Sequence, residues 1–218
     1  MKKYKYFLFD LDGTVTDSKK GVTKSAAYAL DFFGIKVQST DSLTYFIGPP
    51  LTYTFKTFHG FTDEEAEKAV VKFREYYSEK GVFENTIYKG IEDVFELIKL
   101  NGGKLIMATS KAEVFADIIL KTSGLYKYFD FISASSYDTS RISKSDIIKY
   151  ALEQLNIKPS EALMIGDTRF DINGAKDNNI DSVGILYGYG SIDELTEAGA
   201  TWIAEDVTAL KNLIYDAL

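Results

Sequence analysis

Two aspartates one residue apart, Asp10 and Asp12, stand where a buried strand is expected to end. Residues 6–9 form an uninterrupted apolar run that predicts this strand, and Gly13 predicts a turn after the aspartates. In open α/β sheets, reactive groups lie just beyond the carboxyl ends of the strands. Adjacent acids are costly there unless a cation or a reaction needs them. The pair therefore indicates metal binding or carboxylate chemistry.

A calcium loop of the EF-hand type is the first alternative, because it also begins with Asp-x-Asp. Counted from Asp10, such a loop needs an oxygen ligand at position five, which Thr14 would supply. It also needs Gly at position six and Glu at position twelve, where this chain has Val15 and Gly21. The calcium loop fails at two of these three positions. A chance match at a strand end remains the other alternative.

Hydroxyl side chains follow a second expected strand, 104–109, at Thr109 and Ser110. A helix is predicted directly after them, and the free N–H groups and hydroxyls at a helix start bind phosphate readily. The plainer interpretation is that Ser110 caps this helix. Beside Asp10, the same residues would make a phosphate clamp.

A second pair of acids, Asp167 and Asp171, follows an expected strand at 162–166. If a helix begins near Asp167, the spacing of four puts both carboxylates on one side. Either acid could instead be an ordinary residue of a first helical turn. Four carboxylates at two strand ends repel one another unless they share a divalent cation, and we prefer that interpretation.

A fixed positive charge among these acids is expected from Lys144, which stands just before a predicted helix. The plainer interpretation is a solvated lysine, which is usual at a helix start although it opposes the helix dipole. In the functional interpretation, Lys144 grips a phosphoryl group and limits the repulsion among the acids. Lys19, Lys20 and Lys111 are competing candidates whose spacing fits less well.

The elements that must position these residues alternate between strand and helix from residue 85 onward. This alternation predicts an α/β fold with a doubly wound, parallel, Rossmann-like sheet. Residues 16–84 have helical periodicity and no convincing buried strand, with a capping box at Thr62 and Glu65. We therefore expect an α/β core of residues 1–15 and 85–218, interrupted by an all-helical cap of residues 16–84.

Composition excludes several classes of function. The net charge of −7 and the lack of a basic stripe argue against nucleic-acid binding. The chain has no cysteine and His59 is its only histidine, which excludes a Cys-based phosphatase and a multi-His zinc site. No apolar run approaches the length of a membrane span, and the basic start at Met1–Lys5 lacks the features of a signal peptide. We expect a cytoplasmic protein.

The four strand-end segments, taken in order, resemble the four motifs of the haloacid dehalogenase-like hydrolase superfamily. These are Asp10-x-Asp12-Gly13-Thr14, Thr109, Lys144 and Gly166-Asp167-x-x-x-Asp171. The resemblance spans nearly the whole chain and implies the phosphoglycolate phosphatase-like subgroup with a helical cap. Ser145 departs from the pattern, because a proline often follows the lysine in such proteins.

The resemblance implies a Mg²⁺-dependent phosphatase that acts on a small phosphorylated metabolite through an aspartyl-phosphate intermediate. In this scheme Asp10 is the nucleophile and Asp12 the general acid and base. Asp10, Asp167 and the backbone carbonyl of Asp12 bind the metal, and Asp171 supports them. The groups that hold the phosphate are Thr109, Ser110 and Lys144.

Other functions stay open at this point. A phosphomutase would use the same core residues, and a non-catalytic phospho-accepting module or a silent scaffold is a more distant alternative. The substrate candidates are phosphoglycolate, a nucleoside monophosphate, a sugar phosphate and pyrophosphate. Specificity is expected from the cap, around Gly48-Pro49-Pro50 and the helices carrying Tyr28, Phe55 and Tyr76, although such aromatics are more often packing residues.

Overall fold

The computed structural model describes residues 3–136 and 141–218. Met1 and Lys2 of the basic start lie outside these residues. The chain divides into two compact units: a core unit, made of the chain up to Thr16 together with Ile87–Leu218, and a helical unit, Asp17–Thr86. The divisions thus fall after residues 16 and 86, against the expected 15 and 84.

The core unit is built on a parallel six-stranded sheet with the order β5-β4-β1-β6-β7-β8. The strands are β1 (Tyr6–Phe9), β4 (Lys104–Ala112), β5 (Phe131–Ser135), β6 (Ala162–Gly166), β7 (Asp181–Ile185) and β8 (Trp202–Ala204). The strand order runs in opposite directions on the two sides of β1, and such a switch point is where α/β sheets bind ligands.

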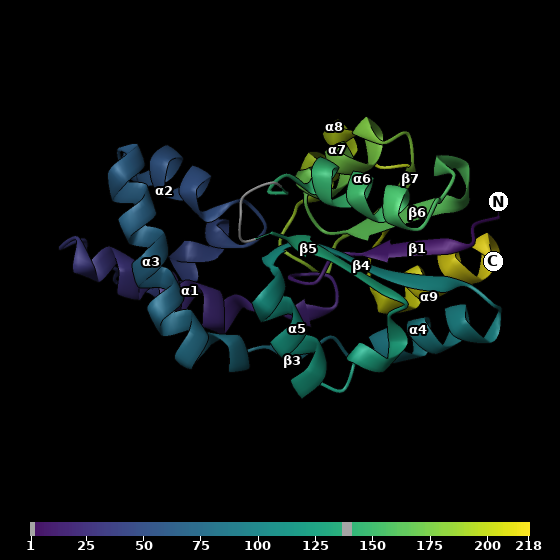
Figure 1. The fold of residues 1–218 in the computed structure, drawn as a ribbon, viewed down its shortest axis with the longest axis horizontal. Coiled ribbons are helices and arrows are strands. Elements are labelled where there is room, and N and C mark those ends of the chain that lie inside the picture. Colours follow the sequence, from purple (N-terminus) through teal and green to yellow (C-terminus); the bar gives the residue numbers. More distant parts are fainter. Residues whose placement is uncertain (1–2, 137–140) are drawn as a thin grey trace. The chain divides into compact units, whose positions relative to one another are not determined.

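Helices cover both faces of this sheet (Figure 1). One face carries α6 (Lys144–Gln154), α7 (Arg169–Asp177) and α8 (Ile192–Ala198), and the other carries α4 (Ile91–Leu100), α5 (Glu113–Thr122) and α9 (Val207–Ala217). Two short 3₁₀ helices, η3 (Tyr126–Tyr128) and η4 (Pro159–Glu161), lie in the connections. The expected fold class, a doubly wound α/β core with an all-helical insertion, is confirmed.

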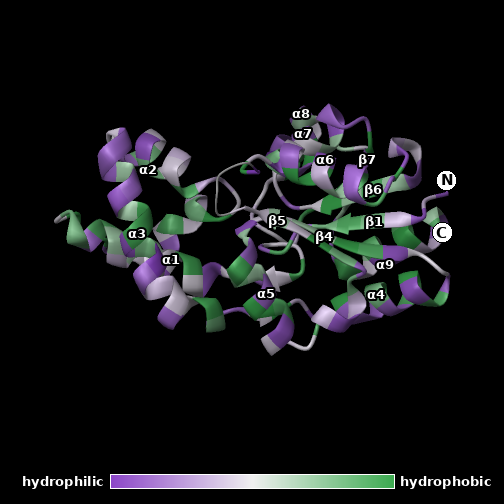
Figure 2. Cartoon of the chain, in the orientation of Figure 1, coloured by the Kyte–Doolittle hydropathy of each residue, from purple (hydrophilic) through white to green (hydrophobic). Residues whose placement is uncertain are grey.

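Buried strands explain why the sheet forms. The side chains of β1 alternate between two hydrophobic layers, as the two-residue period of a strand requires. Leu8 packs with Ile148 of α6 in one layer, and Phe9 packs edge-to-face on Phe95 of α4 in the other. Figure 2 shows the hydrophobic residues along these strands. Both faces of β1 are therefore packed against helices, which fixes the position of Asp10, the residue that follows the strand.

The helical unit has its own core. Its helices are α1 (Lys19–Phe32), η1 (Thr40–Phe46), α2 (Leu51–His59), α3 (Asp63–Glu79) and η2 (Gly81–Phe83). Phe46 and Phe55 are buried within it, and the His59 ring stacks on Phe46 and contacts Phe55. The expected capping box of Thr62 and Glu65 at the start of α3 is present. For Phe55 the packing interpretation is the right one.

The chain passes between the units through two short strands, β2 (Thr16–Asp17) and β3 (Thr86–Ile87), which form a separate two-stranded sheet.

One expected boundary is wrong. Strand β4 does not end at Thr109 but continues to Ala112, and α5 begins only at Glu113. Ser110 therefore lies in the strand and caps no helix. The position before α5 belongs to Ala112, whose side chain cannot cap. The continuation carries a register shift between Thr109 and Ala112, a bulge that a hydrophobicity pattern does not reveal.

Candidate active site

Three buried carboxylates meet at the carboxyl edge of the sheet. Asp10 follows β1, Asp167 follows β6, and Asp171 lies in the first turn of α7. They are 3%, 0% and 0% exposed, and each offers an oxygen atom within 4.8 Å of the others. The cause is topological, because β1 and β6 are parallel neighbours whose ends meet at one edge.

Lys144 is the cation inside this group. Its ammonium Nζ lies 2.7 Å from Asp10 Oδ1 and 2.8 Å from Asp171 Oδ1, and it donates a hydrogen bond of 2.9 Å to the carbonyl of Ala108. Burial alone would lower the pKa of Lys144. The charges of Asp10 and Asp171 outweigh burial and raise the pKa above its usual value, so the ammonium stays charged.

The competing lysines are placed elsewhere. Lys19 pairs with Asp41 and Lys20 with Glu84, both inside the helical unit. Lys111 pairs with Asp12 rather than with Asp10, Asp167 or Asp171, which we call the three-carboxylate group. Among the candidates, Lys144 is therefore the lysine that the structure brings to Asp10.

Negative charge exceeds positive charge at this site. Burial, with help from Asp171 and Asp12, raises the pKa of Asp10 to about 6, against the opposing effect of Lys144. Burial also raises the pKa of Asp167 well above its usual range, and the charges of Asp171 and Asp10 add to that effect. A cation in addition to the Lys144 ammonium would relieve the repulsion among these carboxylates.

The donor set fits a hard divalent cation. The three-carboxylate group offers oxygen atoms only, which is the preference of Mg²⁺. The side chain of Asp12 is not part of this group. Asp171, expected to be a supporting residue, belongs to the group itself.

Asp12 and Thr109 lie at the edge of the same site. Asp12 Oδ2 is 2.9 Å from the ammonium of Lys111, and both side chains are nearly buried. Thr109 is buried at 1% exposure, and its hydroxyl accepts a hydrogen bond from the Lys111 N–H. Ser110 is partly buried beside them. Carboxylates, ammonium groups and hydroxyls are thus brought together in one unit, and groups of these kinds can serve phosphoryl transfer.

Sequence reasoning assigned no role to the loop after β7, although it holds Asp167 in place. The Tyr189 N–H donates to Asp167 Oδ2 at 2.8 Å, and the Tyr187 hydroxyl donates to the Thr14 carbonyl at 3.1 Å. A Cβ on Gly190 would lie 2.0 Å from the carbonyl oxygen of Asp167, so only glycine fits there. The Gly188-Tyr189-Gly190 sequence is the local pattern that could have indicated a structural role for this loop.

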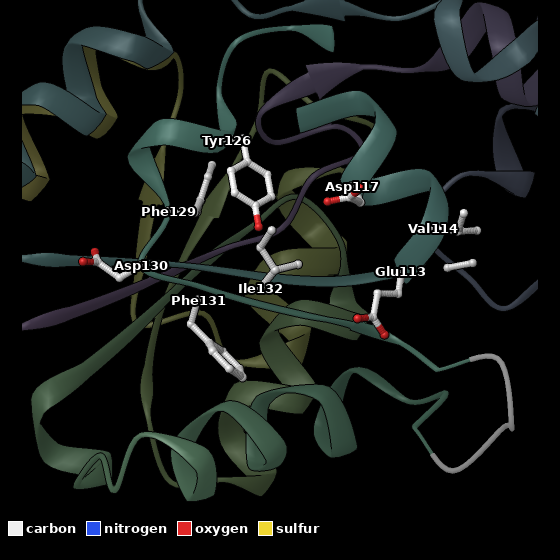
Figure 3. Close-up of a pocket in the computed structure, with 9 residues that line it drawn as sticks. Glu113, Val114, Asp117, Tyr126, Phe129, Asp130, Phe131 and Ile132 are labelled. Carbon is white, nitrogen blue, oxygen red and sulfur yellow. The ribbon is translucent and has the colours of Figure 1, made fainter. Parts of the chain in front are cut away.

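A separate pocket of about 630 Å³ lies between α5, η3 and β5. Tyr126, Phe129 and Ile132 gather around it, with Glu113 and Asp117 of α5 at its side (Figure 3). Its acids are paired with basic residues: Glu113 with Arg141, Asp117 with Lys121, and Asp130 with Lys99 and Lys104. Neither Lys144 nor any residue of the three-carboxylate group lines it, so this pocket is separate from that group.

Comparison with known proteins identifies the family of this chain. Residues 7–185 match the family model described as "Haloacid dehalogenase-like hydrolase". A 5'-nucleotidase of Pseudomonas aeruginosa is 36% identical over 212 residues, which are 97% of this chain and 96% of that protein. The tyrosine-protein kinase PtkA of Mycobacterium tuberculosis is 37% identical over 201 residues, which are 92% of this chain and 68% of that protein.

A solved structure is closely similar as well. The crystal structure of a "predicted phosphatase" from Clostridium acetobutylicum superposes with a TM-score of 0.97 at 46% identity, covering 99% of this chain and 100% of that one. The chain belongs to the haloacid dehalogenase-like hydrolase family, and it is an enzyme of the phosphatase type. Among the described residues, no helix is long and apolar enough to cross a membrane.

Proposed function

We propose that this protein is a Mg²⁺-dependent phosphatase that hydrolyses a small phosphomonoester through an aspartyl-phosphate on Asp10. The observation that carries this proposal is the buried group of Asp10, Asp167 and Asp171 around Lys144. Burying three carboxylates against one lysine is unfavourable for folding, and such an arrangement is typical of a site that performs chemistry.

Each side chain of the site has a distinct role in the proposed reaction. Asp10 attacks phosphorus and Asp12 gives a proton to the leaving oxygen, after which Asp12 takes a proton from the water that releases phosphate. Lys144 holds the nucleophile in place and neutralises the phosphoryl oxygens, while Thr109 and Ser110 donate hydrogen bonds to them.

Asp10, Asp167 and the backbone carbonyl of Asp12 are the proposed Mg²⁺ ligands, with Asp171 beside them. The cation supplies charge neutralisation for the phosphoryl group during the in-line transfer. We further propose that the helical unit acts as a cap, which excludes bulk water from the reaction and selects the substrate.

Among the substrate candidates we favour a nucleoside 5'-monophosphate. Support comes from the Pseudomonas aeruginosa 5'-nucleotidase, which aligns with nearly the whole chain. Phosphoglycolate, sugar phosphates and pyrophosphate are the competing substrates. A phosphomutase would use the same core residues and would return a phosphorylated product instead of free phosphate.

The test is a panel of these phosphorylated compounds assayed for phosphate release with Mg²⁺ and with excess chelator. We expect the highest kcat/KM for a nucleoside 5'-monophosphate and no release without the cation. Asp10→Asn should lower kcat at least about a thousandfold, because it removes the nucleophile. Asp93→Asn is the matched control, because Asp93 is an exposed acid of the same unit.

Three outcomes would contradict the proposal. Unchanged activity of Asp10→Asn would exclude the covalent mechanism. Transfer of phosphate within a sugar, without release, would indicate a mutase. Consumption of ATP with labelling of tyrosine would instead favour the activity for which the mycobacterial relative is named.

A further inference from the structure

Lys111, which belongs to none of the four motifs, forms an ion pair with Asp12 of the first motif. Lys111 Nζ lies 2.9 Å from Asp12 Oδ2, and the two side chains are only 7% and 12% exposed. Paired charges this far from solvent are seldom retained for stability alone, because desolvation offsets most of their attraction. The pair therefore requires an explanation in terms of the reaction.

A bulge in β4 aims Lys111 at this position. Thr109 pairs with Ala134 of β5, but the next pair along the strands is Ala112 with Ser135. Ser110 and Lys111 are thus extra residues on β4, and such insertions re-aim side chains next to active sites. The Lys111 N–H donates to Thr109 Oγ1 at 3.2 Å, which ties the bulge to a residue of the site.

The pairing leaves the two oxygens of Asp12 in different situations. Oδ2 is held by Lys111, whereas Oδ1 is buried and has no hydrogen-bond partner among the described residues. A carboxylate with one oxygen fixed cannot rotate freely, so the other oxygen keeps one direction. General acid–base catalysis needs such a fixed direction, because the carboxylate oxygen must point at the atom that gains or loses the proton.

We infer that Lys111 is a positioning residue, which fixes the Asp12 carboxylate for proton transfer to the leaving oxygen and from the attacking water. This inference rests on the proposed function. In the first step the Asp10–phosphorus bond forms, the bond from phosphorus to the leaving oxygen breaks, and that oxygen takes the proton of Asp12. In the second step water attacks phosphorus, Asp12 takes a water proton, and the Asp10–phosphorus bond breaks to release phosphate.

Two substrates separate the positioning of Asp12 from a general structural role. The first is adenosine 5'-monophosphate, or the alkyl phosphate that the wild type hydrolyses fastest, whose leaving oxygen needs a proton. The second is 4-nitrophenyl phosphate, whose leaving group departs without one. We expect Lys111→Met to lower kcat for the alkyl phosphate roughly tenfold to a hundredfold, with KM changed less than about twofold. The pre-steady-state burst of nitrophenolate should keep its wild-type rate, followed by slower turnover.

A double-mutant cycle asks whether Lys111 acts through Asp12. In an Asp12→Asn background, Lys111→Met should cause no further change in the burst rate or in kcat. Lys104→Met is the matched control, because it removes a lysine–aspartate pair from the other end of the same strand. Thermal unfolding checks that each variant is folded. If Lys111→Met does not fold, Lys111→Gln, which keeps a donor, replaces it.

Several results would overturn the inference. They are unchanged kcat in Lys111→Met, an equal fall for both substrates and for the burst, a rise in KM alone, or a further loss in the Asp12→Asn background. The last two would make Lys111 a direct ligand of the substrate. A wild type without Mg²⁺-dependent phosphatase activity would reject the proposed function, and the inference with it.

Discussion

At the scale of single residues, the electrostatics of the site depend on Lys144. This lysine is buried and lies within 2.8 Å of carboxylate oxygens of both Asp10 and Asp171. Removing one partner from a buried ionic group costs more than the group contributes when intact, because the remaining charges lose their compensation. Lys144 therefore affects folding as well as chemistry.

Lys144→Met should destabilise the metal-free protein by about 3–5 kcal/mol, because Asp10 and Asp171 are left without a cation. The measurement is urea unfolding followed by fluorescence. Lys149→Met is the control, since Lys149 is an exposed lysine of the same helix. It should change the free energy of unfolding by less than about 0.5 kcal/mol. Equal effects of the two substitutions would contradict this account.

The raised pKa of Asp10 gives stability a pH dependence with a definite sign. The pKa is about 6 in the folded protein and about 3.9 in an unfolded chain, so between these values the folded state binds more protons. The contribution of Asp10 to the stability of the metal-free protein is therefore complete below about pH 4 and lost as the pH rises through 6.

Mg²⁺ should compete with this proton. We expect Mg²⁺ to raise the melting temperature more at pH 7.5 than at pH 5, with an apparent affinity about tenfold weaker at the lower pH. The measurement is thermal unfolding with and without Mg²⁺ at each pH. In Asp10→Asn the pH dependence of the Mg²⁺ effect should shrink. A Mg²⁺ effect that is the same at both pH values would contradict the expectation.

At the scale of elements, the turn after β1 is under a tight steric constraint. Gly13 has a φ of 83°, which favours glycine, and a Cβ placed there would lie 2.1 Å from Asp167 Oδ2. The turn and the carboxylate after β6 thus pack against each other without room for a methyl group. The backbone at Gly13 in the first motif therefore constrains the position of the Asp167 carboxylate in the fourth.

Gly13→Ala should therefore lower both stability and phosphatase activity. Gly102→Ala is a matched control, because Gly102 has a φ of 78° but open space around it. The control should show only the backbone cost of about 1–2 kcal/mol and keep its activity. Urea unfolding and kcat/KM measure the two effects. If Gly13→Ala is no worse than Gly102→Ala in either measurement, the packing against Asp167 is unimportant.

At the scale of the whole molecule, the chain folds into two units that each bury their own hydrophobic residues. The single tryptophan, Trp202, lies in the core unit, and the single histidine, His59, lies in the helical unit. Each unit therefore carries a natural probe of its own unfolding. Coincidence of the two probes tests whether the molecule unfolds in one step.

Phe55→Ala should destabilise the helical unit by about 3–5 kcal/mol, because it leaves a cavity at a fully buried ring. We expect the denaturant midpoint reported by the His59 proton resonances to fall more than the midpoint reported by Trp202 fluorescence. Leu8→Ala, in the core unit, should produce the opposite order. Equal shifts of both probes in both variants would show that the units unfold together.

The sequence determined the fold class, and it predicted the candidate site residues. Apolar runs that end in Asp10 and Asp167, alternating with amphipathic helices, were enough to predict a parallel sheet with acids at one edge. This worked because strand periodicity and strand ends are local properties of the chain. The helical insertion was visible for the same reason.

Tertiary structure alone decided which charges meet. Spacing along the sequence favoured Lys144 over Lys19, Lys20 and Lys111. The packing of α6 against the sheet decided that its ammonium meets Asp10 and Asp171. The ion pair of Lys111 with Asp12 depends on a bulge in β4, and the support of Asp167 depends on a loop about twenty residues further along the chain. Contacts of this kind join segments far apart in sequence, and no local pattern encodes their geometry.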